Sequence, residues 1–458
     1  MQPAHVFDVQ RWLDAQRFSR FQFAIATLCF AVVALDGLDT ALIGFVVPAL
    51  RSDWHPSTTA VTMLVASGLA GLAIGAFFAG PLGDRIGRRR LLTGSVLGFG
   101  LFSLLSAIAP NITLLTLCRL LTGVGLGAAM PNAITMTSEY SPRSRRALVV
   151  TTMFCGFTFG SAAAGFVAAH VIPRHGWHAM FVIGGVLPLA LGLLMLAALP
   201  ESIRFLIHRQ APADTIAALL RRISREAPDA GHRFVVDEPA GLAGRSPVAQ
   251  LFAPALKFGT LALWCVFWMN LLVVYLVTNW LPSLFRDAGF DLAQAAVVTA
   301  MSQAAVVTAM FQLGGTVGSV LIGRTMDRRN PYAVLVGAYG AGILCVLLVA
   351  WRYQELLSLS LGIFGVGFAV AGSQTGANAL AAGFYPTGSR VTGVSWALGV
   401  GRLGAIAGSF IGALLIASAI GLASVFMLLI VPIACAAAAI GVMGLHYLRA
   451  PRIAEAVE

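Results

Sequence analysis

Twelve long apolar runs constrain the fold of this chain more than any other feature of its sequence. Each run has about 20 to 28 residues, the length of helix that crosses roughly 30 Å of hydrocarbon. Only 11% of the residues are charged, whereas a soluble domain carries about 25%. Since a lipid-exposed segment has to satisfy its own backbone hydrogen bonds, the runs are expected to be helices. The sequence therefore predicts an all-α integral membrane protein.

The runs form two groups of six, which predicts two pseudo-symmetric six-helix bundles. A polar segment rich in arginine separates the groups, and we interpret it as a cytoplasmic linker with a short amphipathic helix at 213–225. The expected division is a tail at 1–20, bundles at 21–199 and 257–448, the linker at 200–256 and a tail at 449–458. The expected spans are 21–50, 58–82, 91–109, 112–138, 147–170, 178–199, 257–284, 293–323, 332–350, 356–382, 391–417 and 421–447.

The basic residues are distributed unevenly along the chain. Of the 30 Lys and Arg, 24 fall on one set of alternating loops, four fall on the other set, and Arg119 and Arg402 lie inside spans. This is the positive-inside pattern, and it predicts that both termini are cytoplasmic. It also explains the net charge of +11 without a nucleic-acid partner. Residues 1–20 contain no apolar core and are not expected to be a cleavable signal.

The sequence offers no catalytic or metal-binding pattern. The six cysteines all fall in expected spans without paired spacing, so we interpret them as small apolar side chains of a helix bundle. No cluster of histidine, cysteine and carboxylate residues has metal-ligand spacing. No combination of nucleophile, base and metal suggests an enzyme. We therefore expect no catalytic residues and no metal.

The first span contains two carboxylates, Asp36 and Asp39, the only acidic residues inside any expected span. They are three residues apart, so on a helix they lie on one face. Charge in the middle of a bilayer is costly, and the groups that carry it normally face a cavity, a partner or a transported ion. The first span is therefore the strongest indication of function in the chain.

The two halves repeat one motif at equivalent places. Residues 80–85 read GPLGDR after the second span, and residues 323–328 read GRTMDR after the eighth. Two copies of G-x-x-x-D-R in a chain of six plus six spans resemble the major facilitator superfamily. The resemblance covers nearly the whole chain and implies two bundles around a midplane site with alternating access. We expect Asp84 to cap a helix N-terminus or to pair with an arginine in one state only. Arg85–Arg90 also anchor the inner face of the membrane, but anchoring alone leaves the Gly and Asp positions of the motif unexplained.

Further stretches are similar to the aromatic acid:proton symporter family within that superfamily. They are DGLDTALIG at 36–44, CRLLTGVGLGAAMPN at 118–132, PTGSRVTG at 386–393 and GRLG at 401–404. The resemblance implies functional roles for Asp36, Asp39, Asp84, Arg119, Glu139, Asp327, Arg390 and Arg402. With the neighbouring basic residues, the gating candidates are Gly80, Asp84, Arg85, Arg88, Glu139, Arg143, Asp327, Arg328 and Arg390.

Helix rise places Asp39 and Arg119 at similar depth in the membrane. Asp39 is roughly 16 Å from the outer end of its span, and Arg119 about 12 Å from the outer end of the fourth span. We expect Asp39 or Asp36 to accept the coupling proton, with Arg119 as a conditional partner. A carboxylate beside a guanidinium stays ionised, whereas a buried carboxylate that leaves its cation takes up a proton. A static ion pair that fixes helix packing is the alternative.

Arg402 is expected about 18 Å deep in the second half, where no span holds an acidic residue. A substrate carboxylate would complete its charge with a bidentate contact. Pairing with Asp36 is the alternative. The other candidates for substrate binding, besides Arg402, Arg119 and Asp39, are Tyr275, Asn279, Gln312, Gln374, Asn378, Trp396 and Phe157.

These observations predict a secondary transporter that imports an aromatic carboxylate anion with protons, without other cofactors. The resemblance implies a monomer in a bacterial inner (plasma) membrane. A symporter of another organic acid or sugar-like metabolite is the first alternative, and a non-transporting membrane sensor is the second. One feature departs from the family pattern: QAAVVTAM at 294–301 recurs at 303–310, and we interpret it as a neutral tandem duplication.

Overall fold

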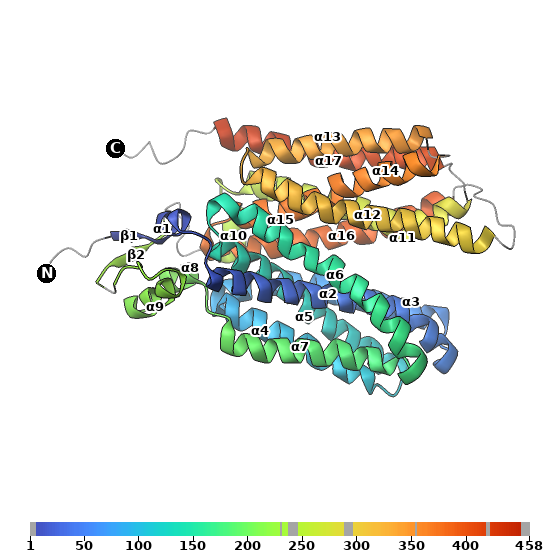
Figure 1. Cartoon of the computed structure of the whole chain (residues 1–458), viewed down its shortest axis with the longest axis horizontal. Coiled ribbons are helices and arrows are strands. Elements are labelled where there is room, and N and C mark those ends of the chain that lie inside the picture. The colour runs from blue at the N-terminus through green and yellow to red at the C-terminus, as the bar shows by residue number, and fades with distance from the viewer. Residues whose placement is uncertain are drawn as a thin grey trace. The chain divides into compact units, whose positions relative to one another are not determined.

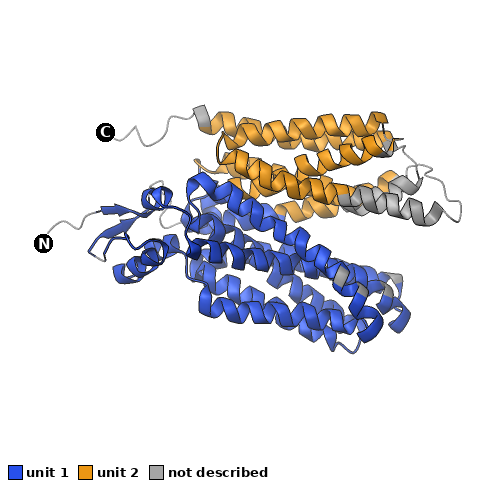
Figure 2. Cartoon of the chain, in the orientation of Figure 1, with its two compact units in different colours: residues 1–253, 381–399 blue, residues 254–380, 400–458 orange. Residues whose placement is uncertain are grey.

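The structure is a computed structural model that describes residues 6–229, 231–236, 246–287, 296–352, 355–417 and 422–449. For residues 278–287 and 296–309 it describes the helix backbone but not the side chains. The chain divides into two compact units (Figure 2). Unit 1 comprises residues 1–253 and 381–399, and unit 2 comprises residues 254–380 and 400–458.

Unit 1 contains six long helices at the first six expected spans. Short polar side chains cap several of them where the apolar runs begin. Ser19 and Gln22 form a capping box at the first helix, and Asn111 accepts a hydrogen bond from the Leu114 N–H at the fourth. The helices are α2 (Arg20–Trp54), α3 (Thr58–Ile86), α4 (Arg88–Ala107), α5 (Ile112–Tyr140), α6 (Arg146–His175) and α7 (His178–Ala198). Within the unit, α3 packs along α5, α2 packs along α6, and α4 packs against both α5 and α7.

The polar end of unit 1 is built from the N-terminal segment and the segment that follows α7. Its elements are β1 (Val6–Asp8), α1 (Val9–Ala15), α8 (Ile203–His208), α9 (Ala213–Ile223), β2 (Arg233–Val235) and α10 (Pro247–Leu251). β1 pairs with β2 in parallel, and these strands lie with α1, α8 and α9 at one end of the unit (Figure 1). The predicted amphipathic helix is confirmed as α9, which buries Ile216 and Leu220.

Unit 2 contains helices at the remaining expected spans. They are α11 (Lys257–Asp287), α12 (Ala296–Met326), α13 (Pro331–Arg352), α14 (Leu356–Val366), α15 (Gly372–Phe384), α16 (Arg390–Ala417) and α17 (Leu422–Arg449). α15 and α16 extend into unit 1 through residues 381–399. The expected span at 356–382 is not one regular helix, because a π-helical turn at Gly367–Ala371 joins α14 to α15.

The prediction of an all-α membrane fold is confirmed. Eleven helices among the described residues are long and apolar enough to cross a membrane. α12 has 31 residues at the eighth expected span, and part of it lies outside the residues with described side chains. Large apolar side chains such as Phe78, Leu344 and Phe410 are exposed, as expected for surfaces that contact lipid. The duplicated segment 294–310 lies almost wholly outside the described side chains.

Candidate functional site

The structure brings Asp39 of α2 and Arg119 of α5 into a bidentate ion pair. Arg119 Nη1 donates to Asp39 Oδ1 at 2.8 Å, and Nη2 donates to Oδ2 at 2.9 Å. Asp39 is 1% exposed and Arg119 is 5% exposed. The Arg119 guanidinium also lies 5.8 Å from the ring centroid of Phe181. Both charges are therefore removed from water and stabilise each other with well-aligned hydrogen bonds.

Asp36 lies one turn before Asp39 and is also buried. The Thr40 hydroxyl donates to Asp36 Oδ1 at 3.5 Å. The next residue, Gly37, allows α2 to approach α6 closely, because a Cβ atom at this position would lie 2.1 Å from the Phe157 carbonyl oxygen. Phe157 therefore meets α2 through its backbone, and its side chain is half-buried. Gly37, which lies between the two carboxylates in the sequence, thus brings α2 into close contact with α6.

A second buried cluster, which we call the inner cluster, forms around Asp84 of α3. Asp84 Oδ2 accepts hydrogen bonds from the Thr392 N–H at 2.9 Å and from the Thr392 hydroxyl at 2.8 Å. Arg88 Nη2 lies 3.1 Å from Asp84 Oδ1. Asp84 thus caps the first turn of α16, where unpaired N–H groups and the helix dipole favour an anion. This contact lies within unit 1, because residues 381–399 belong to that unit.

Glu139, near the end of α5, joins the inner cluster. Arg390 Nη1 donates to Glu139 Oε1 at 2.7 Å, and Arg88 Nη2 lies 3.6 Å from the same oxygen. The Ser202 hydroxyl donates to Glu139 Oε2. Two carboxylates and two guanidinium groups are thus buried together, and all four side chains are at most 5% exposed.

The other gating candidates differ in position. Gly80 lies beside the start of α16, because a Cβ atom there would lie 2.0 Å from Ser395 Oγ and 2.6 Å from the Thr392 Cα. Arg85 is exposed, and Arg143 is exposed and paired with Asp14 of α1. In unit 2, Asp327 follows the end of α12 and is half-buried, whereas the next residue, Arg328, is exposed. The two G-x-x-x-D-R motifs therefore have different surroundings.

In unit 2, Arg402 Nη1 donates to the Tyr275 hydroxyl at 2.6 Å. Within the described part of that unit, no carboxylate forms an ion pair with Arg402. Gln374 and Asn378 are one turn apart on α15, and both are buried. Among the described residues, Gln374 Oε1, Gln374 Nε2 and Asn378 Oδ1 have no hydrogen-bond partner. Buried amides of this kind are rare unless a ligand or water completes them.

The remaining substrate-binding candidates do not gather there. Gln312 is exposed on α12. Trp396 belongs to unit 1, where its ring packs edge-on against Phe77 at 5.4 Å. The side chain of Asn279 lies outside the described side chains. Among the residues searched, no group of three or more His, Cys, Asp or Glu side chains is placed to hold a metal ion.

Sequence reasoning missed three contributors to these clusters. Thr392 lies in the PTGSRVTG stretch, but only the tertiary structure shows that its N–H and hydroxyl bind Asp84. Ser202 and Arg204 belong to PESIRFL at 200–206. Ser202 binds Glu139, and Arg204 donates to Gln10 of α1. The motif was visible in the sequence, but its partners lie more than 60 residues away.

Comparison with known proteins gives concordant results. The chain is 46% identical to the gallate transporter of Pseudomonas putida over 97% of this chain and 96% of that protein. It is 43% identical to the 4-hydroxybenzoate transporter PcaK of the same species, over 96% of each. The solved structure of the proton:xylose symporter XylE has 19% identity, covers 94% of this chain and 96% of its own, and has a TM-score of 0.70. At this identity the likeness concerns the fold.

These comparisons confirm the expected twelve-helix fold and the expectation of a transporter rather than an enzyme. Residues 29–352 match the family model described as Major Facilitator Superfamily. The chain belongs to the Major Facilitator Superfamily.

Proposed function

We propose that this chain imports an aromatic carboxylate together with protons by alternating access. The substrate class is supported by the relatives at 46% and 43% identity, which are named as gallate and 4-hydroxybenzoate transporters. The arginine-rich loops and both termini lie in the cytoplasm, and the membrane is a bacterial inner membrane. The bundles comprise residues 21–199 and 257–448, with a linker at 200–256 and tails at 1–20 and 449–458. The working unit is the monomer.

The observation that carries this proposal is the buried ion pair between Asp39 and Arg119. Breaking the pair leaves Asp39 as a buried carboxylate without its cation, and such a group binds a proton. Forming the pair again releases the proton. A transporter that makes and breaks this pair once in each cycle couples proton movement to its change of access. Asp36, one turn away and also buried, is the second group that can carry a proton.

Arg402 and Tyr275 supply the contact for the substrate carboxylate. The guanidinium already donates to one hydroxyl and has further N–H donors, so it can donate two hydrogen bonds to a carboxylate in a bidentate contact. Gln374 and Asn378 are buried in the same unit, and some of their amide atoms have no hydrogen-bond partner in the part of the chain that the structure describes. Such amides suit the hydroxyl groups of a hydroxylated ring. The anionic end and the ring substituents would thus be recognised by different side chains.

The inner cluster acts as the gate on the cytoplasmic side. Its bonds hold the start of α16 against α3 and α5 through Asp84, Glu139 and Arg390. Opening toward the cytoplasm requires these bonds to break together, which leaves buried charges without partners. The free-energy cost of the unpaired charges disappears once water or a different set of partners reaches them. The inner cluster therefore favours two discrete states, one closed and one open toward the cytoplasm.

The proposal is tested by uptake of labelled benzoate, 4-hydroxybenzoate and gallate into cells that express the chain. Uptake is measured at external pH values of about 6 and about 8, with and without a protonophore. We expect accumulation of a hydroxylated benzoate that is larger at the lower pH and is abolished by the protonophore. Absence of uptake of any aromatic acid by protein present in the membrane would refute the proposed substrate. Accumulation unaffected by the protonophore would refute proton coupling.

A further inference from the structure

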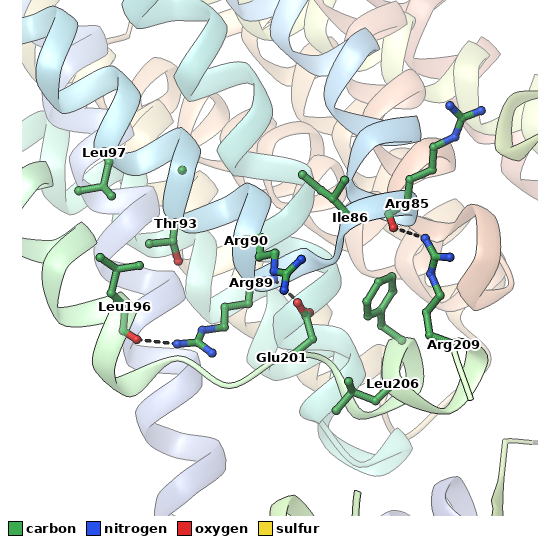
Figure 3. Close-up of a pocket in the computed structure, with 12 residues that line it drawn as sticks. Arg85, Ile86, Arg89, Arg90, Thr93, Leu97, Leu196, Glu201, Leu206 and Arg209 are labelled. Atoms are coloured by element: carbon green, nitrogen blue, oxygen red, sulfur yellow. Dashed lines mark hydrogen bonds between the residues drawn. The ribbon is translucent and has the colours of Figure 1, made fainter. Parts of the chain in front are cut away.

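A pocket of about 830 Å³ lies in unit 1, outside the two charged clusters described above. It is formed where α3 ends, α4 begins, α7 ends and α8 begins. Four arginines, Arg85, Arg89, Arg90 and Arg209, line it together with a single carboxylate, Glu201 (Figure 3). The pocket therefore has an excess of positive charge at the arginine-rich end of the membrane helices.

Glu201 does not neutralise these arginines. Its Oε1 accepts hydrogen bonds from the backbone N–H groups of Arg88 at 3.0 Å, Arg89 at 3.1 Å and Ser202 at 2.9 Å. The Glu201 carboxylate thus caps the N-terminus of α4, which has no other side-chain cap. Among the described residues, no carboxylate forms an ion pair with the guanidinium of any of the four arginines.

Among the described residues, the hydrogen bonds of the Arg89 and Arg209 side chains in the pocket go to neutral partners. Arg89 Nη2 donates to the Leu196 carbonyl oxygen at 2.6 Å, and Arg209 Nη2 donates to the Arg85 carbonyl oxygen. These bonds orient the two guanidinium groups and leave most of their N–H donors open. A concentration of unneutralised donors of this kind is suited to phosphate oxygens.

Thr93 of α4 gives an independent indication of a ligand. It lines the pocket, is 2% exposed, and its hydroxyl has no hydrogen-bond partner among the described residues. Other threonines of unit 1, such as Thr116 and Thr122 on α5, donate to the carbonyl four residues earlier. A buried hydroxyl that forgoes this bond and borders a basic pocket is placed to donate to a bound anion.

The pocket continues from its arginines onto an apolar surface. Leu97 of α4 and Leu196 of α7 line it, and Leu196 is 50% exposed. Leu193, one turn earlier on α7, is 63% exposed. Both helices are long and apolar enough to cross a membrane, so we expect these exposed side chains to face acyl chains. A soluble anion would use only the basic part of the pocket, whereas a lipid would use both parts.

We propose that this pocket binds the headgroup of an anionic phospholipid from the cytoplasmic leaflet. The phosphate contacts Arg89, Arg90, Arg209 and the Thr93 hydroxyl, and an acyl chain lies along Leu97 and Leu196. Basic pockets between membrane helices on the cytoplasmic side are suited to such headgroups. The proposed phosphate contacts use none of the residues of the Asp39–Arg119 pair or of the inner cluster.

The test is native mass spectrometry of the purified full-length chain, titrated with phosphatidylglycerol and, separately, with phosphatidylcholine. The test variant is R90Q/R209Q, and the matched control is R145Q/R225Q, which removes the same charge from exposed arginines outside the pocket. Each basic residue contributes about fivefold to binding of anionic lipid, so R90Q/R209Q is expected to lose roughly 25-fold in affinity for phosphatidylglycerol. The control is expected to bind like the wild type. Equal losses in the two variants, or equal wild-type affinity for the two lipids, would overturn the proposal.

A second measurement separates a lipid from a soluble anion. T93V keeps the shape of the side chain, removes the hydroxyl, and is expected to lower affinity for phosphatidylglycerol about fivefold. Glycerol phosphate, the soluble headgroup, is expected not to compete at concentrations where the lipid saturates. Competition at equal concentration would overturn the lipid assignment, because the site would then bind the anion without an acyl chain. Wild-type affinity in T93V would overturn the role of the hydroxyl and the placement of the phosphate.

Discussion

Replacing Asp39 with Asn removes one charge of the buried ion pair and keeps the shape of the side chain. Arg119 then stays buried with its cation unneutralised, and removal of one partner of a buried pair costs about 3–5 kcal/mol of stability. The double variant D39N/R119Q leaves no buried charge at this place. It is expected to recover most of the lost stability, because neutral replacement of a whole buried pair is often tolerated. Thermal unfolding of the purified variants in detergent measures this difference.

Transport separates a proton-coupling pair from a pair that only fixes helix packing. Across a difference of about two pH units, each coupled proton supports roughly 100-fold accumulation, since one unit is about 1.4 kcal/mol. D39N and D39N/R119Q are both expected to bring the substrate to an inside-to-outside ratio of about 1, because neither has a carboxylate at this position to take up the proton. Exchange of labelled for unlabelled substrate at equal pH is expected to continue in the double variant.

The assay is uptake into proteoliposomes with an imposed pH difference, using the aromatic acid that the wild type accumulates best. D39E is the control, since it keeps a carboxylate at the same place. Accumulation by D39N/R119Q at the level of the wild type would refute the reasoning, because a stable chain without the pair would then still couple protons. The pair would in that case serve packing alone.

The remaining predictions concern the substrate contact, the gate and helix packing. R402Q is expected to raise KM for the aromatic acid about 100-fold, because a charged bidentate contact is lost. Tyr275→Phe is expected to raise KM only a few-fold, and initial uptake rates measure both effects. Equal effects would contradict the assigned carboxylate contact. D84N weakens the cap on α16, so the labelling of a cysteine introduced near the inner cluster is expected to increase about tenfold. Unchanged labelling would contradict the role of the inner cluster as a gate. G37A is expected to lower the melting temperature, because the added Cβ atom would meet the Phe157 carbonyl oxygen. G44A on the same helix is the control and is expected to keep or raise the melting temperature, because the added Cβ atom would have no neighbour within 4 Å.

The spans were predictable because length and apolar composition are set by the bilayer. The first span was expected at 21–50 and is found as Arg20–Trp54, with its start set by the capping box of Ser19 and Gln22. The similar depth of Asp39 and Arg119 was also predictable, because helix rise is constant. Depth does not specify rotation about the helix axis. That the two side chains face each other therefore became known only from the packing of α2, α5 and α6.

The inner cluster was only partly predictable. The two G-x-x-x-D-R motifs read alike in sequence, yet Asp84 is buried and Asp327 is half-buried. The difference arises because the start of α16 packs in unit 1 beside Gly80, and a local motif contains no information about such a distant neighbour. The pairing of β1 with β2 escaped prediction for the same reason, since Val6 and Arg233 meet across most of the first half of the chain.

The π-helical turn at Gly367–Ala371 determines which side chains lie on the face of α15 that carries Gln374 and Asn378. A π-turn contains one residue more than an α-helical turn, so every side chain after it is rotated by about 100° relative to an uninterrupted helix. Gln374 and Asn378 follow this turn. A regular α-helix of the same sequence would present Ser373 and Ala377 in the corresponding places. The chemistry of this helix face therefore depends on the extra residue of the π-turn, because closing the turn into a regular helix would replace two amides with a hydroxyl and a methyl group.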